Sequence, residues 1–324
     1  MTQSDRLDPE LAAPLAAWLK ATNGGINLHD IPAARKMMEE LFAAQMAKAA
    51  PITGVRTEDR KVPGPAGFPD VFVRIYQPID RPDTVPALLW IHGGGYVLGS
   101  VERDDLLAKH LAIVGQCIVA SVEYRLAPEY PFPAPVEDCY AALTWLSAHS
   151  TEFGVNKSRI AIGGASAGGG LAAGLALLTR DRAEVDVCFQ LLIYPMIDDR
   201  NIASASETVP DTAVWTRENN HMGWRAYLGH EPGGVDVSPY AAAARATDLK
   251  GLPPAYIPVG DLDLFLDENI TYAQRLLAAS VPTELHVYPG AFHGFNGFIP
   301  GAEISRRFNT DRDNALKRML HRQG

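Results

Sequence analysis

The chain has 324 residues and a formal net charge of −9, with 47% hydrophobic and 21% charged residues. This length and apolar content are enough to bury a sizeable core in one large domain or two smaller ones. Lys and Arg number 29 against 38 Asp and Glu, and no basic cluster occurs. That balance argues against nucleic-acid binding, because such binding neutralises phosphates with a basic surface.

The sequence carries no recognisable targeting or membrane-spanning signal. Residues 1–20 contain acidic side chains and lack the basic opening and cleavage site of a signal peptide, and no apolar run is long enough to cross a membrane. Cys117, Cys139 and Cys188 are widely spaced and form no C-x-x-C pair, which predicts reduced, buried thiols rather than a disulfide framework or a zinc site. We therefore expect a soluble, cytoplasmic protein that binds neither nucleic acid nor membranes.

The first 50 residues have a helical pattern, whereas the residues after them alternate in polarity. Leu11, Leu15 and Leu19 are spaced at i, i+4 and i+8 and precede the run AARKMMEELFAAQMAK, which predicts two helices. The stretches 53–62 and 72–78 alternate on either side of a Gly- and Pro-rich connection. This pattern predicts an antiparallel pair of strands.

Short apolar runs then alternate with helical stretches. The predicted strands cover residues 86–91, 117–124, 159–164, 187–194, 254–260 and 283–289. The predicted helices between and after them cover residues 105–114, 135–150, 167–182, 267–280 and 302–322. Nearly continuous apolar strands are typical of a sheet buried on both faces. The sequence therefore predicts an α/β fold with a mostly parallel sheet, and functional residues at the C-terminal ends of its strands.

Ser166 directly follows a predicted strand and precedes a predicted helix, inside the G-x-S-x-G pattern of residues 164–168. The glycines permit a sharp turn that holds the serine in a strained backbone conformation. The helix N-terminus behind the serine offers N–H groups and a positive dipole end to a developing oxyanion. This context favours a nucleophile over the alternative, a serine that only caps the helix.

A glycine-rich loop, His-Gly-Gly-Gly-Tyr at residues 92–96, follows another predicted strand. Three consecutive glycines raise the entropic cost of folding, which indicates a place where main chain must approach a ligand closely. The N–H groups of this loop, together with that of Ala167, can donate to an oxyanion. The alternative, a plain flexible turn, is less suited to glycines that border a hydrophobic strand.

A serine hydroxyl needs a general base to act as a nucleophile at neutral pH. Of the nine histidines, His293 lies in a turn shortly after the last predicted strand, and it is the best candidate for this base. The carboxylate that orients the base follows the penultimate predicted strand, where the candidates are Asp261, Asp263, Asp267 and Glu268. The pattern alone leaves that choice open. The order serine, acid, histidine is the one expected of α/β-hydrolases.

Several motifs together resemble the bacterial hormone-sensitive-lipase-like (family IV) carboxylesterases, a branch of the α/β-hydrolases. They are HGGGY (92–96), VEYRLAPEYPFPAPVEDC (122–139), GASAGGG (164–170), DLDLFLDE (261–268) and FHGF (292–295). We interpret Arg125 and Glu129 of the second motif as structural. The chain departs from the family at Ala165, where Asp or Thr is usual, and at Leu264-Phe265, where the family has Pro-Leu.

The resemblance implies specific roles at the matching positions. Ser166 would be the nucleophile and His293 the base, and Asp263 would be the acid because it falls on the first aspartate of the family's D-P-L-x-D-E motif. The oxyanion hole would be formed by the N–H groups of Gly94, Gly95 and Ala167.

The resemblance also implies an α/β-hydrolase fold with a helical cap. Residues 1–50 would form the N-terminal part of the cap, and residues 51–324 the catalytic domain, with a cap insertion at about 200–230. Trp215, Met222 and Trp224 in that insertion could line an acyl pocket, although such residues more often form the core of a cap.

The activity that the resemblance implies is hydrolysis of short-acyl carboxylic esters through an acyl-enzyme, with a small-molecule ester as partner and no metal or organic cofactor. The alternatives are a lactonase or amidase with the same triad, and a non-catalytic small-molecule receptor on the same fold. Receptors of that kind lose the base, whereas His293 is present here. The apolar edge strand 283–289 also suggests a homodimer formed by sheet extension.

Overall fold

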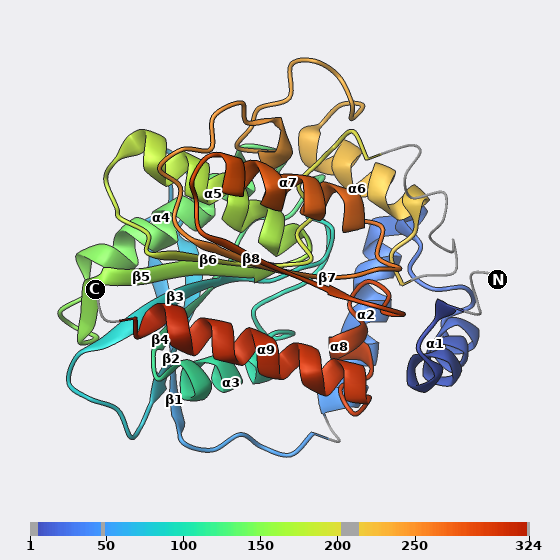
Figure 1. Ribbon diagram of the computed structural model, residues 1–324, viewed down its shortest axis with the longest axis horizontal. Coiled ribbons are helices and arrows are strands. Elements are labelled where there is room, and N and C mark those ends of the chain that lie inside the picture. Colours follow the sequence, from blue (N-terminus) through green and yellow to red (C-terminus); the bar gives the residue numbers. More distant parts are fainter. Residues whose placement is uncertain (1–5, 47–48, 202–213, 323–324) are drawn as a thin grey trace.

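The computed structural model describes residues 6–46, 49–201 and 214–322. A single eight-stranded sheet crosses the molecule in the order β1-β2-β4-β3-β5-β6-β7-β8 (Figure 1). The strands are β1 (Val55–Val62), β2 (Val71–Pro78), β3 (Val85–Ile91), β4 (Ile118–Glu123), β5 (Val155–Ala165), β6 (Phe189–Ile193), β7 (Ala255–Gly260) and β8 (Thr283–Tyr288). Strands β3 to β8 pair in parallel, and β2 is antiparallel to both β1 and β4. The predicted antiparallel opening and mostly parallel sheet are confirmed.

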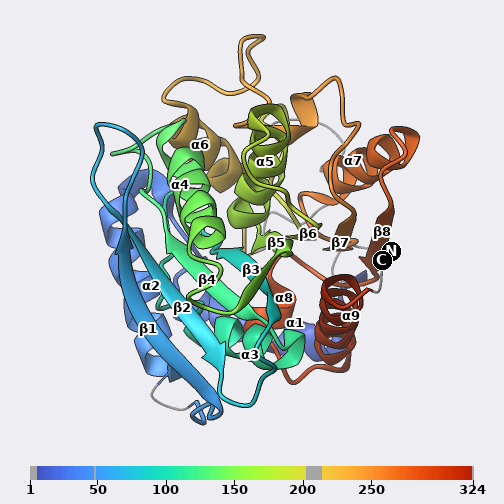
Figure 2. The same cartoon turned by 90° about the vertical axis from the view of Figure 1, so that its left-hand side faces the viewer.

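Helices cover both faces of the sheet. They are α1 (Pro9–Ala21), α2 (Ile31–Met46), α3 (Asp105–Gly115), α4 (Ala134–Ala148), α5 (Ala167–Arg182), α6 (Arg217–Leu228), α7 (Leu266–Ala278), α8 (Phe295–Phe298) and α9 (Glu303–Leu320). Helices α4, α5 and α7 pack on one face, and α3 and α9 on the other (Figure 2). Among the described helices, none is both long enough and apolar enough to cross a membrane.

The burial of each strand follows its place in the sheet. Every residue of β3 and of β7 is buried, because both strands have neighbours on each side and helices on each face. Strand β8 lies at the edge, and most of its residues are only partly buried. The expectation that all the apolar runs are buried on both faces is therefore wrong for β8, whereas its predicted position at the edge of the sheet is confirmed.

The three cysteines are unpaired, as predicted. Cys117 and Cys139 are buried, whereas Cys188 is partly exposed, so its predicted burial is incomplete. Burial raises the pKa of the Cys188 thiol to about 11, which keeps it protonated at neutral pH.

The segment after β4 is held by ion pairs rather than directed to a ligand. Asp138 on α4 is 1% exposed and accepts three hydrogen bonds from Arg125, one from its backbone N–H and two from its guanidinium at 2.8 and 2.7 Å. Glu129 forms a bidentate pair with Arg35 of α2, at 2.7 and 2.8 Å. These contacts agree with the structural interpretation of Arg125 and Glu129.

We expect Asp138→Ala to lower the free energy of unfolding by about 3 kcal/mol, because it leaves the partly buried guanidinium of Arg125 without its charged partner. Urea unfolding measures this change. Glu40→Ala is the matched control, since the pair of Glu40 with Lys36 spans 4.0 Å on the surface and its loss should change the free energy by less than about 0.5 kcal/mol. Equal effects of the two substitutions would contradict the prediction.

Candidate active site

Ser166 occupies the turn between β5 and α5. Its backbone has φ 57° and ψ −122°, a conformation that a residue with a side chain rarely adopts. The N–H of Ser166 donates to the carbonyl of Ile193 at 2.9 Å, and its carbonyl accepts from Met196 at 3.0 Å and from Gly170 at 2.9 Å. The main chain is thus held on both sides of the serine. Its side chain stands at the C-terminal edge of the sheet, where the sequence predicted it.

The two glycines of the G-x-S-x-G pattern allow main-chain segments to touch. A Cβ atom on Gly168 would lie 2.1 Å from the carbonyl oxygen of Ile91, the last residue of β3. A Cβ atom on Gly164 would lie 2.4 Å from the carbonyl of Gly168. Real Cβ contacts are not so short, so α5 can approach β3 and β5 only without these side chains. The predicted steric reason for the glycines is therefore correct, and the close partners are backbone atoms.

Three predicted residues are joined by hydrogen bonds. Nε2 of His293 lies 2.9 Å from Oγ of Ser166, and Nδ1 of His293 lies 2.8 Å from Oδ2 of Asp263. A carboxylate can only accept, so Nδ1 carries the proton and Nε2 is free to accept from the serine. The three residues are at most 8% exposed. Such an arrangement can remove a proton from the hydroxyl and stabilise the resulting imidazolium.

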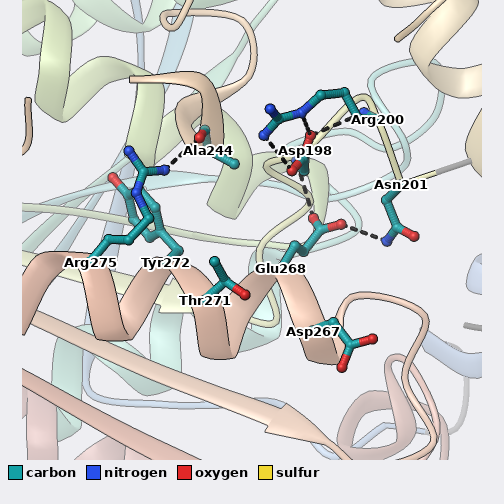
Figure 3. A pocket seen from close by; sticks show the side chains of 9 residues that line it. All are labelled: Asp198, Arg200, Asn201, Ala244, Asp267, Glu268, Thr271, Tyr272 and Arg275. Atoms are coloured by element: carbon teal, nitrogen blue, oxygen red, sulfur yellow. Dashed lines mark hydrogen bonds and ion pairs between the residues drawn. The ribbon is translucent and has the colours of Figure 1, made fainter. Parts of the chain in front are cut away.

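The tertiary structure distinguishes the four candidate carboxylates. Asp261 accepts from the N–H of Gly290 at 2.6 Å and pairs with Arg6 at 2.9 Å. Asp267 is exposed at the start of α7. Glu268 is buried and faces the segment that follows β6 (Figure 3). Only Asp263, 1% exposed, contacts His293 among the four.

The glycine loop lies directly beside the serine. A Cβ atom on Gly93 would lie 3.4 Å from Cβ of Ser166, so no side chain separates the two. Gly94 and Gly95 have φ values of +129° and +59°, which suit glycine. Within the described residues, the N–H groups of Gly94, Gly95 and Ala167 have no backbone acceptor. These are the three donors that the family resemblance implies for an oxyanion hole.

His92 is the first residue of the glycine loop, and its buried ring packs beneath the main chain of that loop, against Tyr124. Its ring is fully buried, stacks on Tyr124 with 4.3 Å between ring centroids, and lies with Nδ1 3.0 Å from the carbonyl of Gly93. Tyr124 also donates its hydroxyl to the carbonyl of His92 at 3.0 Å. Burial lowers the pKa of His92, which favours the neutral ring at physiological pH. The ring therefore packs between the glycine loop and Tyr124.

Two aromatic residues that sequence reasoning missed contact the imidazole of His293. Tyr194, after β6, and Phe265, before α7, lie edge-to-face with it at centroid distances of 4.8 and 4.9 Å. Tyr194 has a φ of 34°, a second strained position beside the serine. Phe265 was visible only as a departure from the family motif. The sequence carried no signal for Tyr194, because nothing local connects it to His293.

The two predicted parts of the cap contact each other. Asn219 of α6 donates its side-chain N–H to the carbonyl of Ile26, in the N-terminal region, at 2.9 Å. The Thr216 hydroxyl caps the start of α6 by accepting from the N–H of Asn219 at 3.1 Å. Residues 202–213 of the predicted insertion lie outside the described residues.

The aromatic residues of the predicted insertion differ in their surroundings. Trp224 is fully buried against Tyr96 and belongs to the core. Trp215 is 5% exposed and lies on the glycine loop, since a Cβ atom on Gly95 would stand 2.1 Å from its Cη2 atom. Met222 is partly buried against the same core. Trp215 is therefore the residue of this group that lies closest to the predicted oxyanion donors.

Metal-ligating side chains are not clustered in the part of the chain that the structure describes. Groups of three or more His, Cys, Asp or Glu side chains that could hold a metal ion do not occur there. The residues that meet at the sheet edge are those of acyl-transfer chemistry.

The combination of a parallel sheet, a strained serine turn and a hydrogen-bonded histidine and carboxylate defines the class of α/β-hydrolases. A family model described as alpha/beta hydrolase fold matches residues 88–297. The chain belongs to this family, and its resemblance to the hormone-sensitive-lipase-like branch is confirmed.

Proteins named as esterases are similar to this chain over most of its length. Carboxylesterase NlhH of Mycobacterium tuberculosis is 38% identical over 273 residues, which are 82% of this chain and 84% of the relative. An arylesterase of Saccharolobus solfataricus is 33% identical over 299 residues, 90% and 92% of the two chains. The solved structure of a bacterial heroin esterase is 44% identical, with a TM-score of 0.93 over 99% of this chain and all of its own.

We expect Gly168→Ala to lower both stability and turnover, because its methyl group would push α5 away from β3 and displace Ser166. Urea titration should show that the free energy of unfolding falls by about 1–3 kcal/mol, as is typical of overpacked cores. Gly234→Ala is the control, since a Cβ atom there meets no other atom within 4 Å. Wild-type turnover in Gly168→Ala would show that the close approach is unnecessary.

Proposed function

We propose that this protein is a serine carboxylesterase that hydrolyses short-acyl esters through an acyl-enzyme on Ser166. The observation that carries the proposal is the unbroken hydrogen-bonded series from Asp263 through His293 to Ser166, beside a glycine loop in which the N–H groups of Gly94 and Gly95 have no backbone acceptor among the described residues. Relatives named carboxylesterase and arylesterase support the same class of substrate.

The proposed reaction begins with an ester whose carbonyl oxygen lies against the N–H groups of Gly94, Gly95 and Ala167. Nε2 of His293 takes the proton of Ser166 as Oγ attacks the carbonyl carbon. The negative charge that forms on the carbonyl oxygen is stabilised by the three N–H donors, and Asp263 stabilises the imidazolium. The imidazolium then gives its proton to the leaving alcohol. Water repeats the sequence on the acyl-enzyme and releases the acid.

The preference for short acyl groups is supported by the position of Trp215. Its indole lies against Gly95 on one side, and a Cβ atom on Gly223 of α6 would stand 3.4 Å from the same indole. Two glycines that are far apart in the sequence therefore lie close to the ring. A large side chain fixed on the oxyanion loop restricts the space beside a bound acyl group.

Three broader assignments complete the proposal. Residues 1–50 and the insertion at about 200–230 form a cap, which is supported by the contact between Asn219 and Ile26. The protein works in the cytoplasm, in keeping with its unpaired thiols. It forms a homodimer through β8, whose edge is only partly buried.

A series of aryl esters from acetate to laurate tests the proposal. Wild type should turn over the short esters fastest, and Ser166→Ala and His293→Ala should each lower kcat by about 10⁴-fold or more, because the nucleophile or its base is removed. His149→Ala, a substitution on the surface end of α4, serves as the histidine control.

Absence of wild-type turnover on every ester would instead favour a lactonase, an amidase or a non-catalytic receptor. Burst release of the aryl alcohol by Ser166→Ala would contradict the assignment of the nucleophile.

Trp215→Ala should move the preference toward longer acyl chains, because it empties the space beside Gly95. We expect the ratio of kcat/KM for hexanoate over acetate to rise by about tenfold, the scale of methylene discrimination in an apolar pocket. Trp145→Ala is the control, since Trp145 stacks on His149 at the far end of α4. An unchanged ratio would assign Trp215 to the cap core alone.

A further inference from the structure

Glu268 is a buried carboxylate that the proposed reaction does not use. It lies in the first turn of α7, 7% exposed, five residues after Asp263. It also borders a cavity of about 210 Å³ between α7 and the residues that follow β6 (Figure 3). Burial raises the pKa of Glu268, whereas hydrogen bonds from the residues around it favour the charged form.

Among the described residues, the hydrogen-bond partners of Glu268 all belong to one segment. We call residues 194–201 the post-β6 segment. Oε1 of Glu268 accepts from the N–H of Ile197 at 2.7 Å and of Asp198 at 3.3 Å, and Oε2 accepts from the side-chain N–H of Asn201 at 2.6 Å (Figure 3 shows Asn201 turned toward the carboxylate). In each of these contacts a carboxylate oxygen is the acceptor.

Two amides strengthen this connection between α7 and the post-β6 segment. The side-chain NH₂ group of Asn201, which donates to Glu268, also donates to the carbonyl of Leu264 at 2.9 Å. Leu264 directly follows Asp263 in the chain. Asn269, the residue after Glu268, donates to the carbonyl of Pro195 at 2.8 Å and is fully buried. The loop that bears Asp263 and the first turn of α7 are therefore attached together to the post-β6 segment at several points.

The other end of the post-β6 segment holds the serine turn. Met196 donates its N–H to the carbonyl of Ser166 at 3.0 Å, and the carbonyl of Met196 accepts from the hydroxyl of Tyr96, the last residue of the glycine loop, at 2.7 Å. The ring of Tyr194 contacts His293. One segment thus touches the turn of the serine, the glycine loop and the histidine, and Glu268 attaches it to the helix that follows the acid.

We propose that Glu268 is a positioning residue, which fixes the post-β6 segment to α7 and thereby sets the distance between Ser166 and the pair of His293 and Asp263. The proposal rests on the proposed function of that site. Proton transfer from Ser166 needs hydrogen-bond contact with His293, which here spans 2.9 Å, and small displacements of reacting groups lower turnover strongly. The carboxylate acts on kcat through this geometry and makes no contact with the ester.

Glu268→Gln tests the proposal with little change of shape. The amide retains one oxygen for the backbone N–H groups but places an N–H group against the N–H of Asn201. We expect kcat for a short aryl ester to fall by about tenfold with KM unchanged within about twofold, on the scale of lost hydrogen bonds to a charged group. Asp267→Asn is the matched control, because it removes an exposed carboxylate from the same helical turn.

A second readout separates positioning from folding. An aryl alkylphosphonate reacts with the serine and releases one phenolate per active site, so it gives both the number of active sites and the rate at each site. We expect Glu268→Gln to keep the number of sites and to lower the rate at each site by about the same factor as kcat. A variant that loses sites or thermal stability but reacts at the wild-type rate per site would overturn the proposal.

Two further outcomes are decided in the same experiment. If Glu268→Gln does not fold, Asn201→Ala removes the contacts to both Glu268 and Leu264 from the partly exposed end of the post-β6 segment, and its rate per site must fall for the proposal to stand. If wild type hydrolyses no ester, the proposed function fails, whereas the ratio of phosphonylation rates still decides the role of Glu268.

Discussion

The close approach of α5 to the ends of β3 and β5 is the constraint on which the rest of the site depends. It brings main-chain atoms of Gly168 against the carbonyl of Ile91, which a side chain would prevent. The turn between β5 and α5 must then be sharp, and Ser166 takes the strained backbone angles that result. Because the glycine loop begins directly after Ile91, the same contact places the proposed oxyanion donors beside the serine.

The remaining groups of the site come from three other places along the same edge of the sheet. Asp263 follows β7, His293 follows β8, and the post-β6 segment lies between them and the serine turn. Parallel strands bring their C-terminal ends to one edge, so residues distant in sequence meet there. Hydrogen bonds and the rings of Tyr194 and Phe265 then determine their separation more closely than the sheet alone can.

Two departures from the family motifs, Phe265 and Ala165, lie in different parts of the site. Phe265 stands where the family has leucine and contributes an aromatic ring to the surroundings of His293. Ala165 precedes the serine, and its carbonyl oxygen would lie 2.7 Å from a Cβ atom on Gly93, so its backbone helps to pack the glycine loop. The first departure changes the contacts of the base, and the second leaves the turn around the nucleophile in place.

The sequence by itself determined the order of strands and helices, the serine turn and the choice of His293, because these depend on local spacing, glycine placement and hydrophobic period. Residue pattern left four carboxylates open after β7, and resemblance to a family selected Asp263 among them. Only the tertiary structure placed Asp263 at 2.8 Å from the imidazole and turned Glu268 toward the post-β6 segment. It also brought Tyr194 and Trp215 to the site. These contacts join residues far apart in the chain, and their geometry is set by how the helices and strands pack, which no local pattern encodes.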